Sequence, residues 1–259
     1  MRNIFDLTGR VAVVVGATSG IGRTLAVGLA RHGADVIPSG RRRRMLEEVC
    51  REIEESGRRT LVHPADASSR ESIDALRDAV LEKFGCVDIL VNAAGHTLKK
   101  PTVAIGEAEW TSILDTNLTG VLRACQSFYE PLKSGGKGRV VNIASLGSFL
   151  AFHEVAAYSA SKSALLSLTK SLACEWARDG ICVNAIAPGV FPTELNRALI
   201  VGTPRGDEIL MRTPMGRFGD PEELIGAAVL LASDGASFLT GQCIAVDGGY
   251  LASGVNSRG

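Results

Sequence analysis

The fold class of this chain is decided by Val11-Ala12-Val13-Val14-Val15-Gly16-Ala17-Thr18-Ser19-Gly20-Ile21-Gly22. The valine-rich run is continuously apolar, as expected of a parallel strand that is buried on both faces. The glycines that follow allow a tight turn and let the backbone approach a pyrophosphate, and the helix that begins there offers free N–H groups. The stretch therefore predicts a dinucleotide-binding turn, although an ordinary strand-to-helix turn can also contain glycines. The candidate cofactor residues in it are Gly16, Thr18, Ser19, Gly20, Ile21 and Gly22.

Short β-branched runs alternate with longer amphipathic stretches along the rest of the chain. We expect strands at Arg10–Val15, Asp35–Ser39, Thr60–His63, Val87–Val91, Gly138–Ala144, Ile181–Ile186 and Gln242–Val246. We expect helices near Gly20–His32, Met45–Ser56, Arg70–Phe84, Glu107–Leu132, Val155–Arg178 and Pro221–Ser233. Strands separated by helices of this length imply right-handed crossovers between parallel strands. The predicted fold class is α/β, with a single Rossmann-type doubly wound parallel sheet and helices on both faces.

No linker, repeat or low-complexity tract divides the chain, so we predict a single dinucleotide-binding domain over residues 1–259. The stretch Pro188–Gly219 is rich in proline and glycine and has no clear strand pattern. Because it follows the carboxyl end of a predicted strand, we expect a substrate loop at about residues 188–219.

The composition argues against several classes of protein. The 28 basic and 28 acidic residues balance, so we expect no binding to nucleic acid or to an anionic membrane surface. No apolar run approaches the ~18–20 residues that span a bilayer, and the N-terminus lacks the apolar region of a signal peptide. The six cysteines form no C-x-x-C pair, and the four histidines are dispersed. We therefore expect reduced thiols, a cytoplasmic location and no metal site.

The end of the second predicted strand selects between the two nicotinamide cofactors. A carboxylate there would bind the adenosine ribose and repel a 2′-phosphate. This chain instead reads Ser39-Gly40-Arg41-Arg42-Arg43-Arg44, with no acid nearby. Arginines at a helix start oppose the helix dipole, whereas a bound 2′-phosphate reverses that sign. We assign Ser39 and Arg41 to phosphate recognition and predict NADP(H) in preference to NAD(H), while Arg43 and Arg44 are explained well enough as a solvated charge run.

Ser145, Tyr158 and Lys162 form the candidate catalytic set. Ser145 follows a predicted strand, at the edge where open α/β sheets bind ligands, and Tyr158 and Lys162 have the spacing that places them on one face of a helix. A lysine ammonium ~4 Å from the tyrosine oxygen would contribute ~4 kcal/mol and lower the tyrosine pKa by about 3 units, toward 7. Tyr158 would then exchange a proton with a substrate oxygen that Ser145 binds, while a hydride moves to or from the cofactor. Each residue alone is better explained as structural, but the combination behind a cofactor loop is not.

Together these motifs resemble those of the short-chain dehydrogenase/reductase family, over about residues 7–250. The matching motifs are Gly16-x-x-x-Gly20-Ile21-Gly22, Asn92-Ala93-Ala94-Gly95, Asn117, Ser145, Tyr158-x-x-x-Lys162 and Pro188-Gly189 with Thr193. The resemblance implies an NAD(P)-binding Rossmann-fold oxidoreductase with a catalytic tetrad of Asn117, Ser145, Tyr158 and Lys162. It implies that the asparagine holds a water in a proton relay to the lysine, and that many members are homotetramers.

The resemblance also implies further cofactor contacts. They would come from Asp66, Ala67, Asn92, Ala93, Ala94, Gly95, Tyr158, Lys162, Pro188, Gly189 and Thr193. One residue departs from the family pattern, because Val15 stands where threonine is usual. We expect this change to remove a structural hydrogen bond and to leave cofactor binding intact.

The substrate is predicted from softer signals. The C-terminal part, from Arg212 to Asn256, resembles most the gluconate 5-dehydrogenase-type sugar-acid and polyol members, and it overlaps with 3-oxoacyl-(acyl-carrier-protein) reductases. We therefore expect an NADP(H)-dependent interconversion of a secondary alcohol and a ketone in a sugar acid or polyol. A 3-oxoacyl-thioester reductase and a non-catalytic dinucleotide-binding protein are the alternatives.

Several residues are substrate-pocket candidates by their position around the motifs. They are Ser145, His96, Leu146, His153, Glu154, Val190 and Phe191. His153 and Glu154 suit a hydroxylated substrate but are explained equally well as surface residues. Lys99 and Lys100 could bind a carboxylate or an acidic carrier protein, although such a pair is more often a solvated loop.

Overall fold

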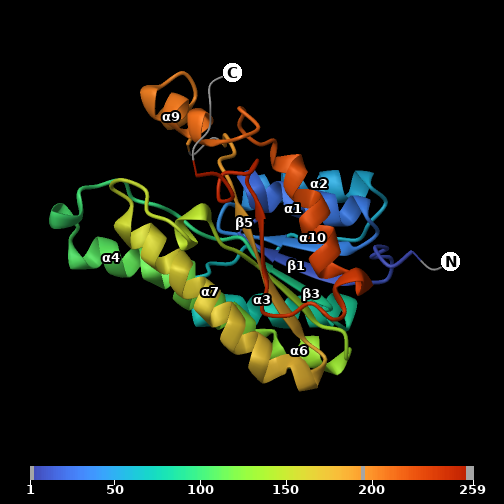
Figure 1. Ribbon diagram of the computed structural model, residues 1–259. Coiled ribbons are helices and arrows are strands. Elements are labelled where there is room, and N and C mark those ends of the chain that lie inside the picture. The colour runs from blue at the N-terminus through green and yellow to red at the C-terminus, as the bar shows by residue number, and fades with distance from the viewer. Residues whose placement is uncertain (1–2, 194–195, 255–259) are drawn as a thin grey trace.

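The computed structural model describes residues 3–193 and 196–254. Six strands of this part form one parallel sheet in the order β2-β1-β3-β4-β5-β6 (Figure 1). The strands are β1 (Val11–Val15), β2 (Asp35–Ser39), β3 (Ile89–Asn92), β4 (Arg139–Ile143), β5 (Cys182–Pro188) and β6 (Cys243–Val246). Strand β1 pairs with β2 on one side and with β3 on the other, so the strand order reverses next to β1. Open α/β sheets bind ligands beyond the carboxyl ends of the strands at such a point.

Helices cover both faces of this sheet (Figure 1). One face carries α1 (Gly20–Arg31), α2 (Arg43–Glu55) and α10 (Ile225–Ala232). The other face carries α3 (Arg70–Phe84), α5 (Gly120–Ser127) and the long α7 (Ala156–Trp176). Helix α4 (Glu107–Leu114) packs beside α7 and extends to one side as an arm, and α6 (Tyr129–Ser134) leads into β4. Within the described ranges, no helix has both the length and the apolarity that crossing a membrane requires.

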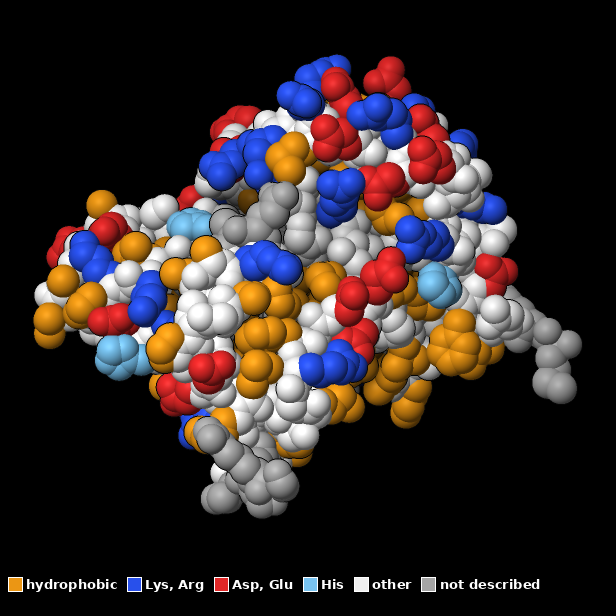
Figure 2. Space-filling view, turned by 90° about the horizontal axis from the view of Figure 1, so that it is seen from above, with side chains coloured by type: hydrophobic (Ala, Val, Ile, Leu, Met, Phe, Trp, Pro, Cys, Tyr) orange, Lys and Arg blue, Asp and Glu red, His pale blue; other side chains and the backbone are white. Residues whose placement is uncertain are grey.

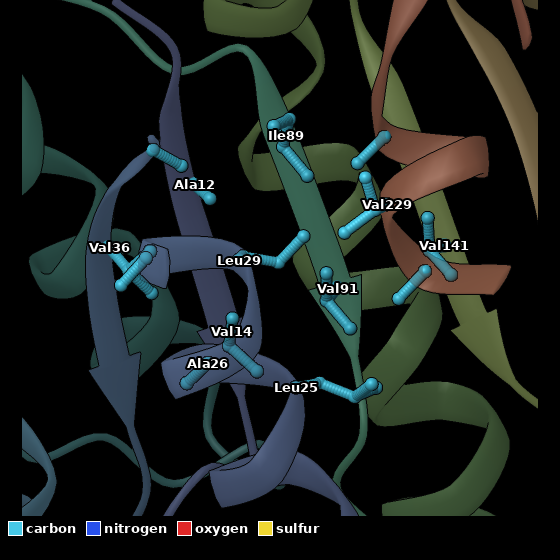
Figure 3. Packing of buried hydrophobic residues seen from close by; sticks show 14 of the residues in the cluster. Ala12, Val14, Leu25, Ala26, Leu29, Val36, Ile89, Val91, Val141 and Val229 are labelled. Carbon is cyan, nitrogen blue, oxygen red and sulfur yellow. The ribbon is translucent and has the colours of Figure 1, made fainter. Parts of the chain in front are cut away.

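Strand β1 shows why the sequence pattern predicted a doubly covered sheet. Ala12 and Val14 face α1, where they pack with Leu25, Ala26 and Leu29 (Figure 3). The alternate residues of the strand face the cluster formed with α3, α5 and α7. Every residue of β1 is at most 3% exposed, because both faces of the strand are covered. A continuously apolar run is therefore what this position in the fold requires.

The strand expected at Thr60–His63 is wrong, because none of these residues is in a strand. The segment runs along the outer edge of β2, and two hydrogen bonds frame it. The Val36 N–H donates to the Arg59 carbonyl oxygen, and the Ala65 N–H donates to the Gly40 carbonyl oxygen, each over 3.1 Å. Pro38 lies where the next N–H of this ladder should be, and proline has none. The proline therefore prevents a seventh strand from pairing.

The single helix expected at Glu107–Leu132 is also wrong. Helix α4 ends at Leu114, one wider π-helical turn spans Asp115–Thr119, and α5 begins at Gly120. A second break at Phe128 separates α5 from α6. The π turn contains Asn117, and such turns often occur where a helix carries a functional residue.

The segment expected to be a substrate loop contains two short helices, α8 (Arg197–Ile200) and α9 (Pro204–Arg212). Helix α9 begins as its sequence indicates, because the Thr203 hydroxyl accepts a hydrogen bond from the Gly206 N–H at 3.2 Å, and Pro204 occupies the first turn. Both helices lie above the sheet on the side where β5 ends (Figure 1). Residues 194–195 of the expected loop lie outside the described part, as do Val255 and Asn256.

Candidate active site

The glycine loop joins β1 to α1 and contacts the loop after β3. A side-chain carbon at Gly16, where φ is +92°, would overlap the backbone nitrogen of Ala94. A carbon at Gly22 would overlap the carbonyl oxygen of Gly16. The N-terminus of α1 has no side-chain cap, and its first turn carries no acidic residue. It therefore offers free N–H groups and a positive dipole end, which fit the pyrophosphate of a dinucleotide.

Arg42 is the arginine that reaches back to the glycine loop, and the sequence reasoning missed it. Its guanidinium donates to the Thr18 hydroxyl at 2.6 Å and to the Ser19 hydroxyl at 2.7 Å. Arg41 is exposed next to it, and its charge acts on Asp66 and His96. The two guanidinium groups thus follow the end of β2, where a 2′-phosphate would be recognised. The only signal for Arg42 in the sequence was the arginine run itself, and this run does not indicate which of its arginines turns toward the glycine loop.

The side chains of Ser39, Arg43 and Arg44 interact with other partners. The Ser39 hydroxyl is fully buried and donates to the His63 carbonyl oxygen at 3.1 Å. This hydroxyl therefore does not face a ligand at the edge of the sheet. Arg43 and Arg44 lie 3.1 and 3.8 Å from Glu47 and Glu48, one turn along α2. They form the solvated charge run that the sequence suggested for them.

Asp66 and Ala67 lie farther along the same edge. The Asp66 carboxylate accepts hydrogen bonds from the Ser68 N–H at 3.0 Å and from its hydroxyl at 2.7 Å. These bonds hold the pKa of Asp66 below its usual value, and the charge of Arg41 adds to the effect. The Ala67 carbonyl oxygen accepts a hydrogen bond from Arg123 at 3.3 Å. Asp66 therefore stays ionised and acts as an acceptor only.

The loop after β3 lies next to the glycine loop. The Ala93 N–H donates to the Val15 carbonyl oxygen at 2.8 Å. The Asn92 side chain points into the sheet, where it donates to the Asn142 carboxamide oxygen at 2.9 Å. Asn92 can therefore meet a cofactor through its backbone, as Ala93, Ala94 and the exposed Gly95 can.

Ser145, Tyr158 and Lys162 come together between the end of β4 and the start of α7. The Ser145 hydroxyl accepts a hydrogen bond from the Gly147 N–H at 3.1 Å and also hydrogen-bonds Tyr158. Lys162 is buried, and its ammonium donates to the Ile143 carbonyl oxygen at 2.7 Å. The lysine nitrogen lies 5.8 Å from the centre of the Tyr158 ring. The structure thus places an acid–base group, a hydroxyl and an ammonium around one point.

The expected lowering of the Tyr158 pKa by Lys162 is wrong for this state of the protein. Burial raises the pKa of Tyr158, and the hydrogen bond with Ser145 opposes that rise. Burial also lowers the pKa of Lys162 to about 8. The reason is geometric, because the ammonium is held against the Ile143 carbonyl oxygen and not against the phenol oxygen.

Asn117 connects this trio to the loop after β3. It is fully buried in the π turn, and its carboxamide oxygen accepts from the His96 N–H at 2.9 Å. Its amide nitrogen donates to the His96 carbonyl oxygen at 2.9 Å and to the Ser161 hydroxyl at 3.1 Å. A side-chain carbon at Gly95 would lie 3.2 Å from the Asn117 oxygen and 3.6 Å from the Lys162 nitrogen. Asn117 therefore fixes the backbone of this loop directly beside Lys162.

Pro188, Gly189 and Thr193 lead from β5 across the edge of the sheet. The Gly189 N–H donates to the Val246 carbonyl oxygen at 2.8 Å, and a side-chain carbon at Gly189 would lie 2.6 Å from the Asp247 Cα. The Thr193 methyl group lies 3.4 Å from the place where a side chain at Gly20 would begin. Thr193 thus lies against the glycine loop.

The expected pocket residues do not all lie together. Leu146 and Val190 belong to an apolar cluster with residues of α8 and α9, whereas Phe191 packs into the core cluster of α1 and α10. Partial burial lowers the pKa of His96, and the charge of Arg41 adds to this. The His153 side chain is 87% exposed, and that of Glu154 is 26% exposed. The polar candidates His96, His153 and Glu154 are therefore partly or largely exposed, whereas the apolar ones lie in the cluster with α8 and α9 or in the core.

Comparisons with known proteins match almost the whole chain. The adh_short_C2 family model, described as enoyl-(acyl carrier protein) reductase, matches residues 16–251. Gluconate 5-dehydrogenase of Gluconobacter oxydans (strain 621H) is 38% identical and covers 97% of this chain and 98% of its own. For 2-dehydro-3-deoxy-D-gluconate 5-dehydrogenase of Dickeya dadantii (strain 3937), the identity is 40%, with 96% and 98% covered. The crystal structure of a gluconate 5-dehydrogenase from Burkholderia cenocepacia J2315, in complex with NADP and tartrate, has a TM-score of 0.93 and 37% identity over 97% of this chain and 98% of that one.

Proposed function

Because the chain belongs to the short-chain dehydrogenase/reductase family and is an oxidoreductase that acts on CH–OH groups, we propose that it interconverts a secondary alcohol and a ketone of a sugar acid with NADP(H). The observation that carries the proposal is the convergence of Asn117, Ser145, Tyr158 and Lys162 beside the glycine loop. The names of the relatives at 38% and 40% identity refer to gluconate and to a deoxygluconate, both of which are sugar acids. They support a sugar acid over the 3-oxoacyl thioester and over a non-catalytic role.

The residues at the edge of the sheet fit a nicotinamide dinucleotide, which supplies or accepts the hydride when bound. The glycine loop and the uncapped α1 N-terminus would hold its pyrophosphate. Arg41 and Arg42, together with the Thr18 and Ser19 hydroxyls, would bind a 2′-phosphate, and this supports NADP(H) over NAD(H). Asp66 and Ala67 would meet the adenine. The segment Pro188–Thr193 would hold the nicotinamide carboxamide.

The chain's own residues move the proton and hold the substrate oxygen. Ser145 binds the carbonyl oxygen, and Tyr158 donates a proton to it as the ketone is reduced, or takes the proton back from the alcohol in the reverse direction. Lys162 would hold the nicotinamide ribose, and its ammonium lies 5.8 Å from the centre of the Tyr158 ring. Asn117 holds the loop beside Lys162. By resemblance to the family, it would also hold a water in a proton relay to the lysine.

We also propose a cytoplasmic homotetramer. Val103, just before α4, is 99% exposed, Trp110 of α4 is 38% exposed, and Phe238, just before β6, is fully exposed. Exposed apolar side chains of this size are commonly covered in assemblies. All six cysteines are free thiols, as expected in a reducing compartment. Analytical ultracentrifugation tests the assembly, and a monomer at micromolar concentration would refute it.

The function is tested by following NADPH absorbance with several oxidants. These are 5-keto-D-gluconate, other keto sugars, and an acetoacetyl thioester for the alternative. We expect oxidation of NADPH with the keto sugar acid and slower oxidation of NADH. Tyr158→Phe should abolish turnover but still bind NADPH in a fluorescence titration. Activity confined to the thioester would overturn the substrate, and wild-type turnover in Tyr158→Phe would overturn the acid–base role.

A further inference from the structure

The loop after Gly95 carries two adjacent lysines whose ion pairs differ. The Lys100 ammonium donates to both carboxylate oxygens of Glu109, at 2.8 and 2.9 Å. The Lys99 ammonium lies 3.5 Å from the nearer carboxylate oxygen of Glu154, and its side chain is 44% exposed. An ammonium has three donors, so Lys99 keeps donor capacity for a ligand where Lys100 is already well paired.

This loop is held in place at both ends. Asn117 binds both the N–H and the carbonyl oxygen of His96, at 2.9 Å each. The Lys100 N–H donates to the Glu154 carbonyl oxygen at 2.7 Å. Lys99 lies between these two anchors, and the four residue steps from the Gly95 Cα to the Lys99 Cα span at most ~14 Å. Because Gly95 adjoins Lys162, Lys99 is attached four residues along the chain from the point where this loop meets the catalytic residues.

Glu154 has an unusual backbone conformation that places it against this loop. Its φ of +65° makes it the only non-glycine residue with a positive φ in the part of the chain described. A glutamate persists in this region only where its surroundings hold it there, and such residues are concentrated at functional sites. Its carboxylate lies between the Lys99 ammonium at 3.5 Å and the His153 ring nitrogen Nδ1 at 3.7 Å.

Among the described residues of the loop after Gly95, one cation is suited to an anionic substrate group. Figure 2 shows basic, acidic and histidine side chains gathered on the arm at the left, the side that carries α4 in Figure 1. Among the basic groups of this loop, Lys100 is bound to Glu109. The pKa of His96 is lowered, which favours its neutral form. Lys99 remains, and its present partner is itself a carboxylate.

We propose that Lys99 is a specificity-determining residue that binds the substrate carboxylate, and that Glu154 forms the ion pair with the Lys99 ammonium while no substrate is bound. The inference rests on the proposed sugar-acid function, because such a substrate carries its carboxylate at the opposite end of the carbon chain from a 5-ketone. With the ketone at Ser145 and Tyr158, the carboxylate replaces Glu154 as the partner of Lys99. An uncharged ketose gains nothing from this exchange.

The test compares four variants on two substrates, 5-keto-D-gluconate and an uncharged ketohexose. Lys99→Met should raise KM for the keto acid at least ~10-fold, with the change on KM rather than on kcat and little change for the ketohexose. Lys99→Arg should restore most of the loss. Lys100→Met is the matched control and should change KM less than about 2-fold, because this lysine serves Glu109. Glu154→Gln should lower KM for the keto acid a few-fold, because the competing carboxylate is gone.

The outcomes separate this inference from the proposed function. If the wild-type enzyme reduces no keto sugar acid, the proposed function fails and this inference fails with it. If it does reduce one and Lys99→Met is unchanged, or loses both substrates equally, only the role of Lys99 is overturned. A raised KM in Glu154→Gln would make Glu154 a substrate ligand and would also overturn the exchange. The KM of Glu154→Gln for the keto acid therefore tests the exchange even if the enzyme does not turn over the ketohexose.

Discussion

Replacing Lys162 by methionine should remove turnover and yet leave the folded protein as stable as before, or more stable, near neutral pH. Lys162 is 5% exposed, and its ammonium donates to the Ile143 carbonyl oxygen at 2.7 Å. Burial lowers its pKa from 10.5 to about 8. At 1.36 kcal/mol per unit, keeping this charge in the folded protein costs about 3 kcal/mol below that pH. Methionine has a similar length and carries no charge to bury.

The sign of the pH dependence follows from the two pKa values of Lys162. Between about 8 and 10.5 the unfolded chain binds more protons than the folded one, so the free energy of unfolding rises with pH. The cost of the buried charge is full below this window and is gone above it. The variant lacks this titration, so the wild type should gain about 2–3 kcal/mol relative to it between pH 7 and pH 10. Leaving the Ile143 carbonyl oxygen without its donor costs the variant ~1–3 kcal/mol at every pH, so its net advantage at pH 7 is about 0–2 kcal/mol.

The assay is urea unfolding of the cofactor-free proteins, followed by circular dichroism at several pH values from 7 to 10. Only the difference between wild type and variant is used, because other titrating groups then cancel. Lys170→Met, at an exposed position of the same helix, is the control and should show no such change. A difference that stays constant with pH, or that favours the variant increasingly as pH rises, would refute the lowered pKa of Lys162.

Three further predictions concern the glycine loop, the cofactor and Asn117. Arg42→Ala should weaken NADPH binding ~10-fold or more and NADH binding little, because only NADPH carries the 2′-phosphate. Arg44→Ala is the control in the same fluorescence titration. Equal losses of affinity for both cofactors would contradict the assignment of Arg42 to the 2′-phosphate. Gly16→Ala should lower Tm well below that of Gly57→Ala, because both glycines have a positive φ but only the carbon at Gly16 meets another atom, and equal Tm values would argue against the close approach. Asn117→Ala should lower kcat and speed hydrogen exchange at the His96 amide, and unchanged exchange would show that Asn117 does not hold this loop.

The sequence predicted those parts of the fold that leave a periodic signal. Asp35–Ser39 and Arg70–Phe84 match β2 and α3 residue for residue, because a buried parallel strand and an amphipathic helix each repeat their pattern over several residues. The errors occur where one residue overrides a pattern. Pro38 removes the N–H that a neighbouring strand at Thr60–His63 would need, although that strand's own residues favour pairing. The π turn at Asp115–Thr119 lies inside a helical pattern that it does not disturb.

In the candidate site, too, the sequence predicted the residues with local requirements and missed the interactions that depend on partners from elsewhere in the fold. Gly16 was predictable because its conformation and its close approach to another backbone both demand glycine. Arg42 was not, because it differs from Arg43 only in standing before the first turn of α2, in extended backbone that turns its side chain back to Thr18. The predicted direction of the Tyr158 pKa shift was wrong because it, too, depends on a partner from elsewhere in the fold. The spacing of Tyr158 and Lys162 says that they share a helix face, but the partner of the ammonium is the Ile143 carbonyl oxygen on another element. Sequence motifs therefore identify which chemical groups are present, whereas the pKa values depend on partners that only the folded chain brings to them.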